Sequence, residues 1–279
     1  MKRIGNLYEK VCSIENLQLA DEKARKGKLR TYGVIEHDKK REVNLLKLRE
    51  TLLNGTFHTS KYDVFTIYEP KEREIYRLPY FPDRILHHAI MNVLEPIWVS
   101  TFTADTYSCI KNRGIHAAAK KVKQALREDP EGTTFCLKLD IRKFYPSINH
   151  DVLKSILRRK LKDKRLLRLL DEIIDSADGV PIGNYLSQYF ANLYLTYFDH
   201  WIKEQKRVKH YFRYADDIVI LASDKSYLHS LMGEIRAYLG DLKLEVKGNW
   251  QVFPVAARGI DFVGYVFFHT HTRMRKGIK

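Results

Sequence analysis

Two adjacent acids, Asp216 and Asp217, lie between two apolar segments, and no other feature of the sequence constrains the fold as strongly. Residues 210–214 and 218–221 have the aromatic and β-branched composition of buried strands, so the acids are expected in a hairpin turn. Asp140 ends a third apolar segment, 134–140. Acids in turns are usually solvated. If two strands of one sheet present carboxylates at the same edge, however, they form a site for Mg²⁺, which proteins hold with few carboxylates plus phosphate and water.

The charge of the chain indicates what such a site acts on. Among 279 residues, 49 Lys and Arg face 34 Asp and Glu, which gives a net charge of +15. A basic surface of this strength attracts the phosphates of nucleic acid. The 44% hydrophobic content excludes a disordered chain. Cys12, Cys109 and Cys136 are too far apart in sequence for a disulfide framework or a zinc finger, so we expect buried reduced thiols. We find neither a signal peptide nor a long apolar run, and expect a cytoplasmic protein that does not bind membranes.

The spacing of apolar residues predicts an α+β fold in which helices pack on a sheet of antiparallel hairpins. A β ribbon is expected where 62–68 alternates in polarity and 69–72 turns the chain into 73–79. The remaining predicted strands are 134–140, 210–214, 218–221, 242–246, 250–255 and 260–268. The predicted helices are 13–26, 42–53, 83–95, 115–127, one or two helices within 151–170, 185–203 and 225–239.

Four segments, in order, resemble the palm motifs of a reverse transcriptase: LDIRKFYPSI at 139–148, GVPIGNYLSQYFANLYL at 179–195, RYADD at 213–217 and GIDFVG at 259–264. The resemblance covers about residues 6–268. It implies a right-hand polymerase with fingers at 1–130, some fingers elements interleaved at 150–178, and a palm at 131–268. A basic stub, 269–279, stands where a thumb would begin, so we expect the thumb to be missing or minimal.

The residues around Ile182 narrow the resemblance to one group. Ile182-Gly183 and Ser187-Gln188, together with NLYEK at 6–10 and EPK at 69–71, are most similar to reverse transcriptases of diversity-generating retroelements. Group II intron and retron enzymes usually carry Gln-Gly and Ser-Pro at these places. The resemblance implies error-prone copying at template adenines, because Ile182 stands where many relatives present a glutamine to the nucleotide. The alternative is that Ile182 merely packs.

The resemblance also assigns roles to individual residues. Asp140, Asp216 and Asp217 would ligate two catalytic Mg²⁺ ions, together with the backbone carbonyl of Ile141. Tyr145 would be the steric gate that favours deoxynucleotides, unless it is a core aromatic. The incoming nucleotide would be contacted by further residues: Lys71, Arg73, Arg113 and Gln188. Lys71 and Arg73, as alternate residues of one strand, would share a face, although a solvated charged hairpin is an equally simple reading. The primer grip would comprise Phe262, Val263 and Gly264.

A run of cations in 154–168 is the second candidate for nucleic-acid contact. It contains only one acid, Asp163, among eight basic residues: Lys154, Arg158, Arg159, Lys160, Lys162, Lys164, Arg165 and Arg168. Such runs are usually solvated helix faces, but this excess favours contact with a phosphate backbone. His87 and His88 are adjacent, so they cannot form the i, i+4 zinc pair, and we expect them to be structural or to contact RNA.

Two positions depart from the family pattern. Related polymerases often carry a lysine after the palm helix, where Trp250 stands here, and Lys247 lies three residues earlier without an assigned role. Only fifteen residues follow Gly264. The expected partners are template RNA, a DNA or RNA primer, dNTPs and a small basic accessory protein that forms an oligomer. Retron-type or phage-defence enzymes, a metal-dependent nuclease and a non-catalytic nucleic-acid-binding scaffold are the alternatives.

Overall fold

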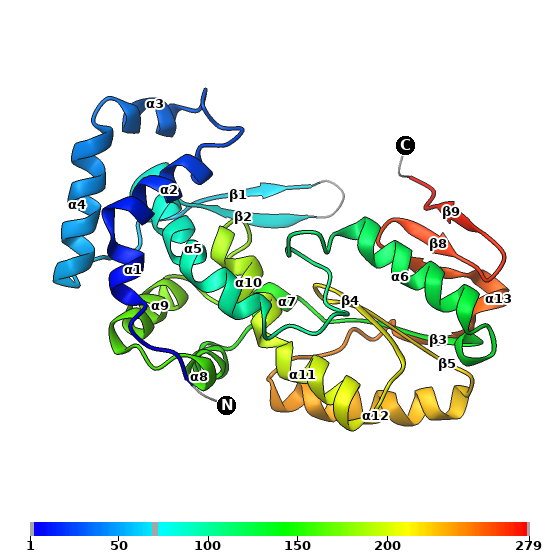
Figure 1. The fold of residues 1–279 in the computed structure, drawn as a ribbon. Coiled ribbons are helices and arrows are strands. Elements are labelled where there is room, and N and C mark those ends of the chain that lie inside the picture. Colours follow the sequence, from blue (N-terminus) through cyan, green and yellow to red (C-terminus); the bar gives the residue numbers. More distant parts are fainter. Residues whose placement is uncertain (1–2, 69–71, 278–279) are drawn as a thin grey trace. The chain divides into compact units, whose positions relative to one another are not determined.

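The computed structural model describes residues 3–68 and 72–277, which form two compact units (Figure 1). The first unit comprises Met1–Ser100 and Asn149–Phe190, and the second comprises Thr101–Ile148 and Ala191–Lys279. Residues 101–130, which we predicted to lie in the fingers, therefore cluster with the second unit. Both units combine helices with antiparallel strands. The predicted α+β class is thus confirmed.

The first unit consists of helices and one two-stranded ribbon. Its elements are α1 (Tyr8–Cys12), α2 (Ile14–Ala24), α3 (Tyr32–Asp38), α4 (Arg41–Asn54), β1 (Asp63–Ile67), β2 (Arg73–Arg77), a π-helical turn (Tyr80–Arg84), α5 (Ile85–Val99), α8 (His150–Lys160), α9 (Lys164–Asp175) and most of α10 (Tyr185–Tyr194). The predicted ribbon is confirmed, since β1 and β2 pair antiparallel with Val64 opposite Tyr76. Helix α4 ends at Gly55, whose φ of 68° suits a residue without a side chain.

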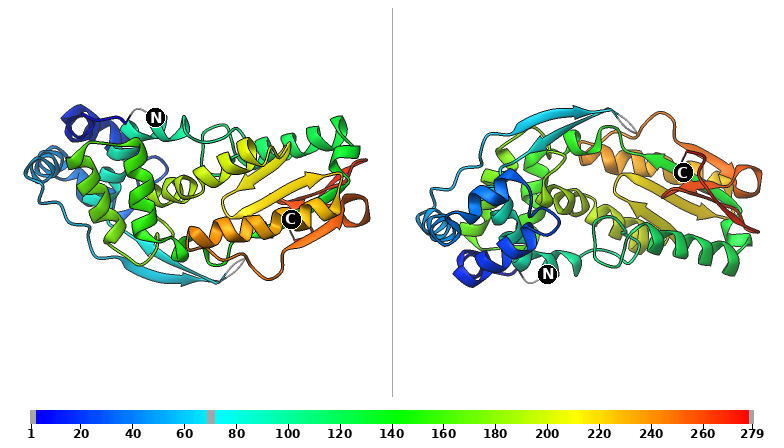
Figure 2. Two further views of the ribbon diagram at one scale, coloured as in Figure 1. Left: turned by 90° about the horizontal axis from the view of Figure 1, so that it is seen from below. Right: turned by 90° about the horizontal axis from the view of Figure 1, so that it is seen from above.

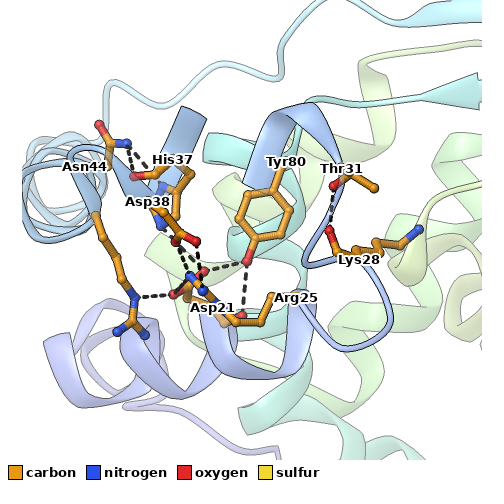
Figure 3. Close-up of polar contacts among 9 residues, drawn as sticks. Asp21, Arg25, Lys28, Thr31, His37, Asp38, Asn44 and Tyr80 are labelled. Carbon is orange, nitrogen blue, oxygen red and sulfur yellow. Dashed lines mark hydrogen bonds and ion pairs between the residues drawn. The ribbon is translucent and has the colours of Figure 1, made fainter. Parts of the chain in front are cut away.

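A polar cluster around Asp21 ties α2, α3 and α4 together (Figure 3). Asp21 is fully buried and accepts hydrogen bonds from Arg25 at 2.8 Å and Arg41 at 2.6 Å. Its other oxygen accepts from the hydroxyl of Tyr80 at 2.5 Å. Burial opposes the charge on Asp21, but these donors outweigh it and lower the pKa of the carboxyl. Both carboxylate oxygens are occupied, which makes this a structural cluster.

The second unit is built on a four-stranded antiparallel sheet in the order β4-β5-β3-β6. Its elements are α6 (Ile115–Glu128), a 3₁₀ turn (Glu131–Thr133), β3 (Phe135–Asp140), α7 (Phe144–Ser147), α11 (Thr196–His200), a π-helical turn (Trp201–Gln205), β4 (His210–Tyr214), β5 (Asp217–Ala222), α12 (Lys225–Asp241), β6 (Gln251–Pro254), α13 (Val255–Arg258), β7 (Ile260–Phe262), β8 (Tyr265–Phe267) and β9 (Thr272–Met274). A separate three-stranded sheet has the order β7-β8-β9.

Three predicted elements of this part of the chain were wrong in detail. Residues 242–246 form no strand, and only Val246 makes a single bridge to Ile141. The segment 260–268 is two strands joined by a turn, and β9 was not predicted. The helix predicted at 185–203 breaks after α10, where the hydroxyl of Thr196 donates to the carbonyl of Asn192 at 3.0 Å. Such a bond to the preceding turn bends helices.

The two faces of the four-stranded sheet are covered by different elements, as Figure 2 shows. Helix α12 packs on β3, β5 and β6. On the other face, Cys136 of β3 and Val219 of β5 belong to a core that includes Val122 of α6 and Phe262 of β7. Alternate residues of a strand share a face, so Asp140 and Asp217 lie on this second face, beyond the part that α6 and β7 cover.

The cysteines and the helix lengths complete the description. All three cysteines are free thiols; Cys12 and Cys136 are buried, but Cys109 is only half-buried, so our prediction was wrong for its burial. Within the described ranges, no helix is both long and apolar enough to cross a membrane.

Candidate active site

Three acids meet at one end of the four-stranded sheet. Asp140, the last residue of β3, pairs in register with Asp217, the first residue of β5. Tyr214 also pairs with Asp217, which leaves Ala215 and Asp216 as a two-residue hairpin turn. Ala215 has a φ of 54°, in the left-handed region that such turns require. The predicted hairpin, with carboxylates of two strands at one edge, is confirmed.

Burial and neighbouring carboxylates raise the pKa of two of these acids, Asp216 and Asp217. Burial is the main cause that raises the pKa of Asp217 to about 6, and the charges of Asp140 and Asp216 add to it. Burial, followed by the charge of Asp140, also raises the pKa of Asp216. Oδ1 of Asp217 is buried without a hydrogen-bond partner. Carboxylates crowded in this way repel one another until a cation neutralises them.

Two lysines supply positive charge to the acids. Nζ of Lys247 donates to Oδ1 of Asp140 at 2.6 Å. Nζ of Lys138, on β3, lies 3.8 Å from Oδ1 of Asp217 and donates to the backbone carbonyl of Asp261. Lys247, for which the sequence indicated no role, therefore contacts one of the three acids directly. No short-range signal reveals this, because the two residues are 107 positions apart.

The donor set fits Mg²⁺. Three His, Cys, Asp or Glu side chains do not come together closely enough to hold a metal ion alone anywhere among the described residues. Mg²⁺ does not need such a cage, because it is usually bound by one or two carboxylates plus water and substrate phosphates. Oδ1 of Asp217, which accepts no hydrogen bond, is a ligand of the right type. In the bridge between Ile141 and Val246, the backbone hydrogen bonds are made by the residues on either side of this pair. The carbonyl oxygen of Ile141 therefore makes none of the hydrogen bonds of the bridge.

A buried ion pair holds the turn that carries Asp216. Arg213 and Asp199 have 0% side-chain exposure and form two hydrogen bonds, of 2.7 and 2.6 Å. Arg213 also donates to the carbonyl of Ala215 at 3.0 Å, inside the turn. Burial disfavours the guanidinium charge, but Asp199 outweighs this and raises the pKa of Arg213. Tyr211 and Thr106 donate to the remaining positions on Asp199, so its carboxylate is fully used.

Tyr145 lies near these acids. It is on α7, which begins four residues after Asp140, and its side chain is half-buried. Burial raises the pKa of its hydroxyl, and the charge of Asp216 contributes. Its ring packs edge-on against Phe144 at 5.7 Å between centroids. The structure thus brings Tyr145 together with the acids, and its role as a steric gate stays a prediction.

Several predicted nucleotide contacts lie in the first unit. Arg73 begins β2 and is exposed, and Gln188 is exposed on α10. Lys71 lies outside the described residues, so the predicted shared face with Arg73 is not described. The carbonyl of Ile182 accepts from the backbone N–H of Tyr76 at 2.8 Å, which attaches the Ile182 loop to the ribbon. The Ile182 side chain is half-buried, so both readings of this residue stay open.

The basic run in 154–168 is partly neutralised by acids outside it. Lys154 donates to Asp175 at 2.6 Å. Arg158 donates to Asp171 at 3.0 Å, and Arg165 donates to Glu9 at 2.6 Å. Because only the acid within the run was counted, the sequence overestimated the positive charge that the run can offer to nucleic acid. Lys162, Lys164 and Arg168 are exposed, so contact with nucleic acid stays a prediction for the run.

The last predicted residues fall elsewhere in the second unit. Arg113 donates to the carbonyl of Thr103 at 2.9 Å and lines a groove beside α6. Phe262 is fully buried at the end of β7, and Val263 and Gly264 form the turn into β8. Of the two histidines of α5, His87 is buried and His88 is half-buried and stacks on Tyr185 at 4.4 Å between ring centroids, so contact of His88 with RNA stays a prediction.

The family model described as reverse transcriptase (RNA-dependent DNA polymerase) matches residues 69–267. Protein YkfC of Escherichia coli K12 is 26% identical over 83% of this chain and 73% of its own length. The group II intron-encoded protein LtrA of Lactococcus lactis subsp. cremoris is 23% identical, over 63% of this chain and 31% of its own. The chain thus spans less than a third of LtrA.

Solved structures share the fold at low sequence identity. A telomerase from Candida tropicalis, in complex with a fragment of telomeric RNA, superposes with a TM-score of 0.58 at 13% identity. The match covers 80% of this chain and 46% of the telomerase chain. The apo telomerase from the same organism has a TM-score of 0.56 at 12% identity, over 79% of this chain and 49% of its own. The expected fingers-and-palm architecture is confirmed by these likenesses.

Proposed function

Because the chain belongs to the reverse transcriptase (RNA-dependent DNA polymerase) family, we propose that it copies an RNA template into DNA in an Mg²⁺-dependent reaction. The observation that carries this proposal is the carboxylate cluster. Asp140 faces Asp217 across two strands, and Asp216 occupies the adjoining turn. A metal-dependent nuclease would use similar acids, but the family match favours a polymerase.

The proposed reaction joins the primer 3′-hydroxyl to the α-phosphate of a dNTP and releases pyrophosphate. When bound, two Mg²⁺ ions would align these oxygens and neutralise the developing charge. Asp140, Asp216 and Asp217 would hold the ions, and the Ile141 carbonyl offers a further oxygen. Arg213 keeps the Asp216 turn in place through the Ala215 carbonyl.

Side chains near the acids would serve the nucleotide. Tyr145, half-buried and within the field of Asp216, would lie under the sugar and exclude a 2′-hydroxyl. Lys247 donates to Asp140; with Mg²⁺ held by that carboxylate, the Lys247 ammonium group would be available to a substrate phosphate. Lys71, Arg73, Arg113 and Gln188 remain proposed contacts to the triphosphate or template.

We further propose that the enzyme is of the diversity-generating type. The support is in the sequence: Ile182-Gly183 and Ser187-Gln188 replace the Gln-Gly and Ser-Pro of group II intron enzymes. An isoleucine cannot hydrogen-bond a base pair, so it removes one means of sensing pair geometry. A template RNA, a primer and a small basic accessory oligomer are the partners that this type requires. The relative LtrA is group II intron-encoded, so an intron-type enzyme is the second candidate.

Primer extension on a defined RNA template tests both levels of the proposal. We expect Mg²⁺-dependent cDNA, with or without accessory protein, and none from Asp140→Ala or Asp216→Ala proteins that still bind the RNA. Sequencing of the product should show misincorporation opposite adenine, reduced in Ile182→Gln. Extension by either alanine variant would overturn the catalytic assignment. An error spectrum that Ile182→Gln leaves unchanged would instead favour the intron-type enzyme.

A further inference from the structure

A basic groove in the second unit lies outside the carboxylate cluster, and of its lining residues only Arg113 has been proposed above to contact the nucleotide. Its volume is about 1180 Å³, and it lies between α6 and the turn that joins β8 to β9. Five Lys or Arg and three His side chains line it, and no Asp or Glu is among its described lining residues. A concave surface with charge of one sign focuses its field on a ligand of the opposite sign. The groove is therefore suited to an anion.

Basic side chains on α6 form a regular stripe. His116, Lys120, Lys123 and Arg127 follow one another at intervals of four, three and four residues, which places them on one face of the helix. At a rise of 1.5 Å per residue the stripe is about 16 Å long. Arg127 forms an ion pair with Glu128 at 3.2 Å, whereas Lys120 and Lys123 are exposed and no carboxylate of the described chain lies within ion-pair distance of them. Their charge is available to a polymer that carries regularly spaced anions.

The opposite wall carries an aromatic platform. The ring of His271 stacks on the ring of Phe268 at 4.6 Å between centroids, with 13° between the planes. The Phe268 N–H donates to the His271 carbonyl at 2.8 Å, which closes the turn beneath them. Gly259 makes this packing possible, because a Cβ there would stand 2.7 Å from the Phe268 ring. Phe268 is thus fixed, and the exposed His271 ring offers a face for stacking.

We propose that this groove binds a single strand of RNA, with phosphates along the α6 stripe and a base stacked on His271. Cations beside aromatic rings are the usual composition of single-strand binding surfaces. An acidic protein segment would use the cations but has no need of the stacked rings. The two walls of the groove, α6 and the sheet that contains β8, pack on the same face of the four-stranded sheet that carries Asp140 and Asp217. The inference goes beyond the proposed polymerase activity, since it concerns binding away from the acids.

Salt dependence of binding tests the stripe. Each phosphate contact to a single strand contributes about 0.7 to the slope of log K against log salt. Lys120→Gln/Lys123→Gln should therefore lower the slope for a fluorescent single-stranded RNA by about 1.4. The matched control Lys225→Gln/Arg236→Gln removes the same charge from α12, on the other sheet face, and should leave the slope unchanged. Equal slopes for the two variants would overturn the proposal.

Substitutions of His271 test the platform separately. Loss of one stacked base costs about 1–3 kcal/mol, so His271→Ala should weaken RNA binding by about 5- to 150-fold, while His271→Phe should retain it. Thermal melting of each variant shows that it folds. If the α6 variant loses binding of a polyglutamate peptide but not of RNA, the groove belongs to an acidic protein partner and the proposal is wrong.

The binding assay contains neither dNTPs nor Mg²⁺, so its outcome is independent of polymerase activity. If the protein is an active polymerase but the α6 variant keeps the wild-type salt slope for RNA binding, only the proposal about the groove is refuted. An inactive protein with the expected change in slope would refute only the proposed function. The two inferences can thus fail separately.

Discussion

Replacement of Asp199 by Asn should both destabilise the protein and disturb the turn that carries Asp216. The change leaves the Arg213 guanidinium fully buried without a counter-charge. Removal of one partner from a buried ion pair costs about 3–5 kcal/mol. In a protein of this size, each kcal/mol corresponds to about 2–4 °C in the melting temperature, so we expect a decrease of about 6–20 °C. Circular dichroism during heating measures it.

Asp171→Asn is the matched control, because it makes the same chemical change at an Arg–Asp pair that solvent reaches. Arg158 and Asp171 have side-chain exposures of 41% and 24%, and pairs of this kind contribute about 1 kcal/mol or less. Primer extension by Asp199→Asn, measured below its melting temperature, should also be slower, because Arg213 bonds the Ala215 carbonyl. A melting temperature within about 2 °C of the wild-type value, with unaltered extension, would refute the reasoning.

Four further predictions concern the acids and the loop at Ile182. Burial raises the pKa of Asp217 to about 6, so ionisation of this carboxyl destabilises the metal-free folded state as the pH rises from about 4. The melting temperature of Asp217→Asn minus that of wild type should accordingly increase from about pH 4 to about pH 7. A difference that stays constant over this range would contradict the prediction. Burial and the charge of Asp140 raise the pKa of Asp216, and the charge of Lys247 partly offsets this, so Lys247→Gln should shift the acid limb of the extension–pH profile to higher pH; an unshifted limb would show that Lys247 does not act on the acids. Gly183 has a φ of 116°, and a Cβ there would lie 2.9 Å from the Tyr76 carbonyl oxygen. Gly183→Ala should cost about 1–3 kcal/mol in denaturant unfolding, whereas an unchanged midpoint would refute the close approach. Finally, Tyr145→Val should increase ribonucleotide incorporation relative to deoxynucleotide incorporation in primer extension, and the same ratio as in wild type would remove the steric-gate assignment.

The acids of the candidate site could be predicted because their signal is local. Asp140 directly ends an apolar strand, and Asp216 and Asp217 lie between two more, so strand composition alone places them at turns or edges. Their common edge followed once the strands were assumed to share a sheet, and the register of Asp140 with Asp217 confirms it. The ribbon and α4 were equally accessible, because alternation and a terminal Gly55 are short-range signals.

Contacts across long sequence separations could not be predicted in this way. Asp199, on a helix, forms an ion pair with Arg213, on a strand. No local sequence pattern predicts this pair. Lys247 reaches Asp140 because the bridge between Val246 and Ile141 brings the two residues side by side, and the Lys247 N–H donates to the Asp140 carbonyl. The basic groove forms because β9 is hydrogen-bonded to β8 beside α6. Strand β9 was not predicted. Each depends on tertiary packing, which overrides local propensity.

Incorporation of a single dNTP into a primer on an RNA template tests the central claim most directly. The account predicts that wild-type protein adds the complementary deoxynucleotide only with Mg²⁺ present. Asp216→Asn, which keeps the shape of the side chain and removes its charge, should give no product above the level without protein. Incorporation by Asp216→Asn at the wild-type rate, in the presence of Mg²⁺, would contradict the assignment of the carboxylate cluster as the active site.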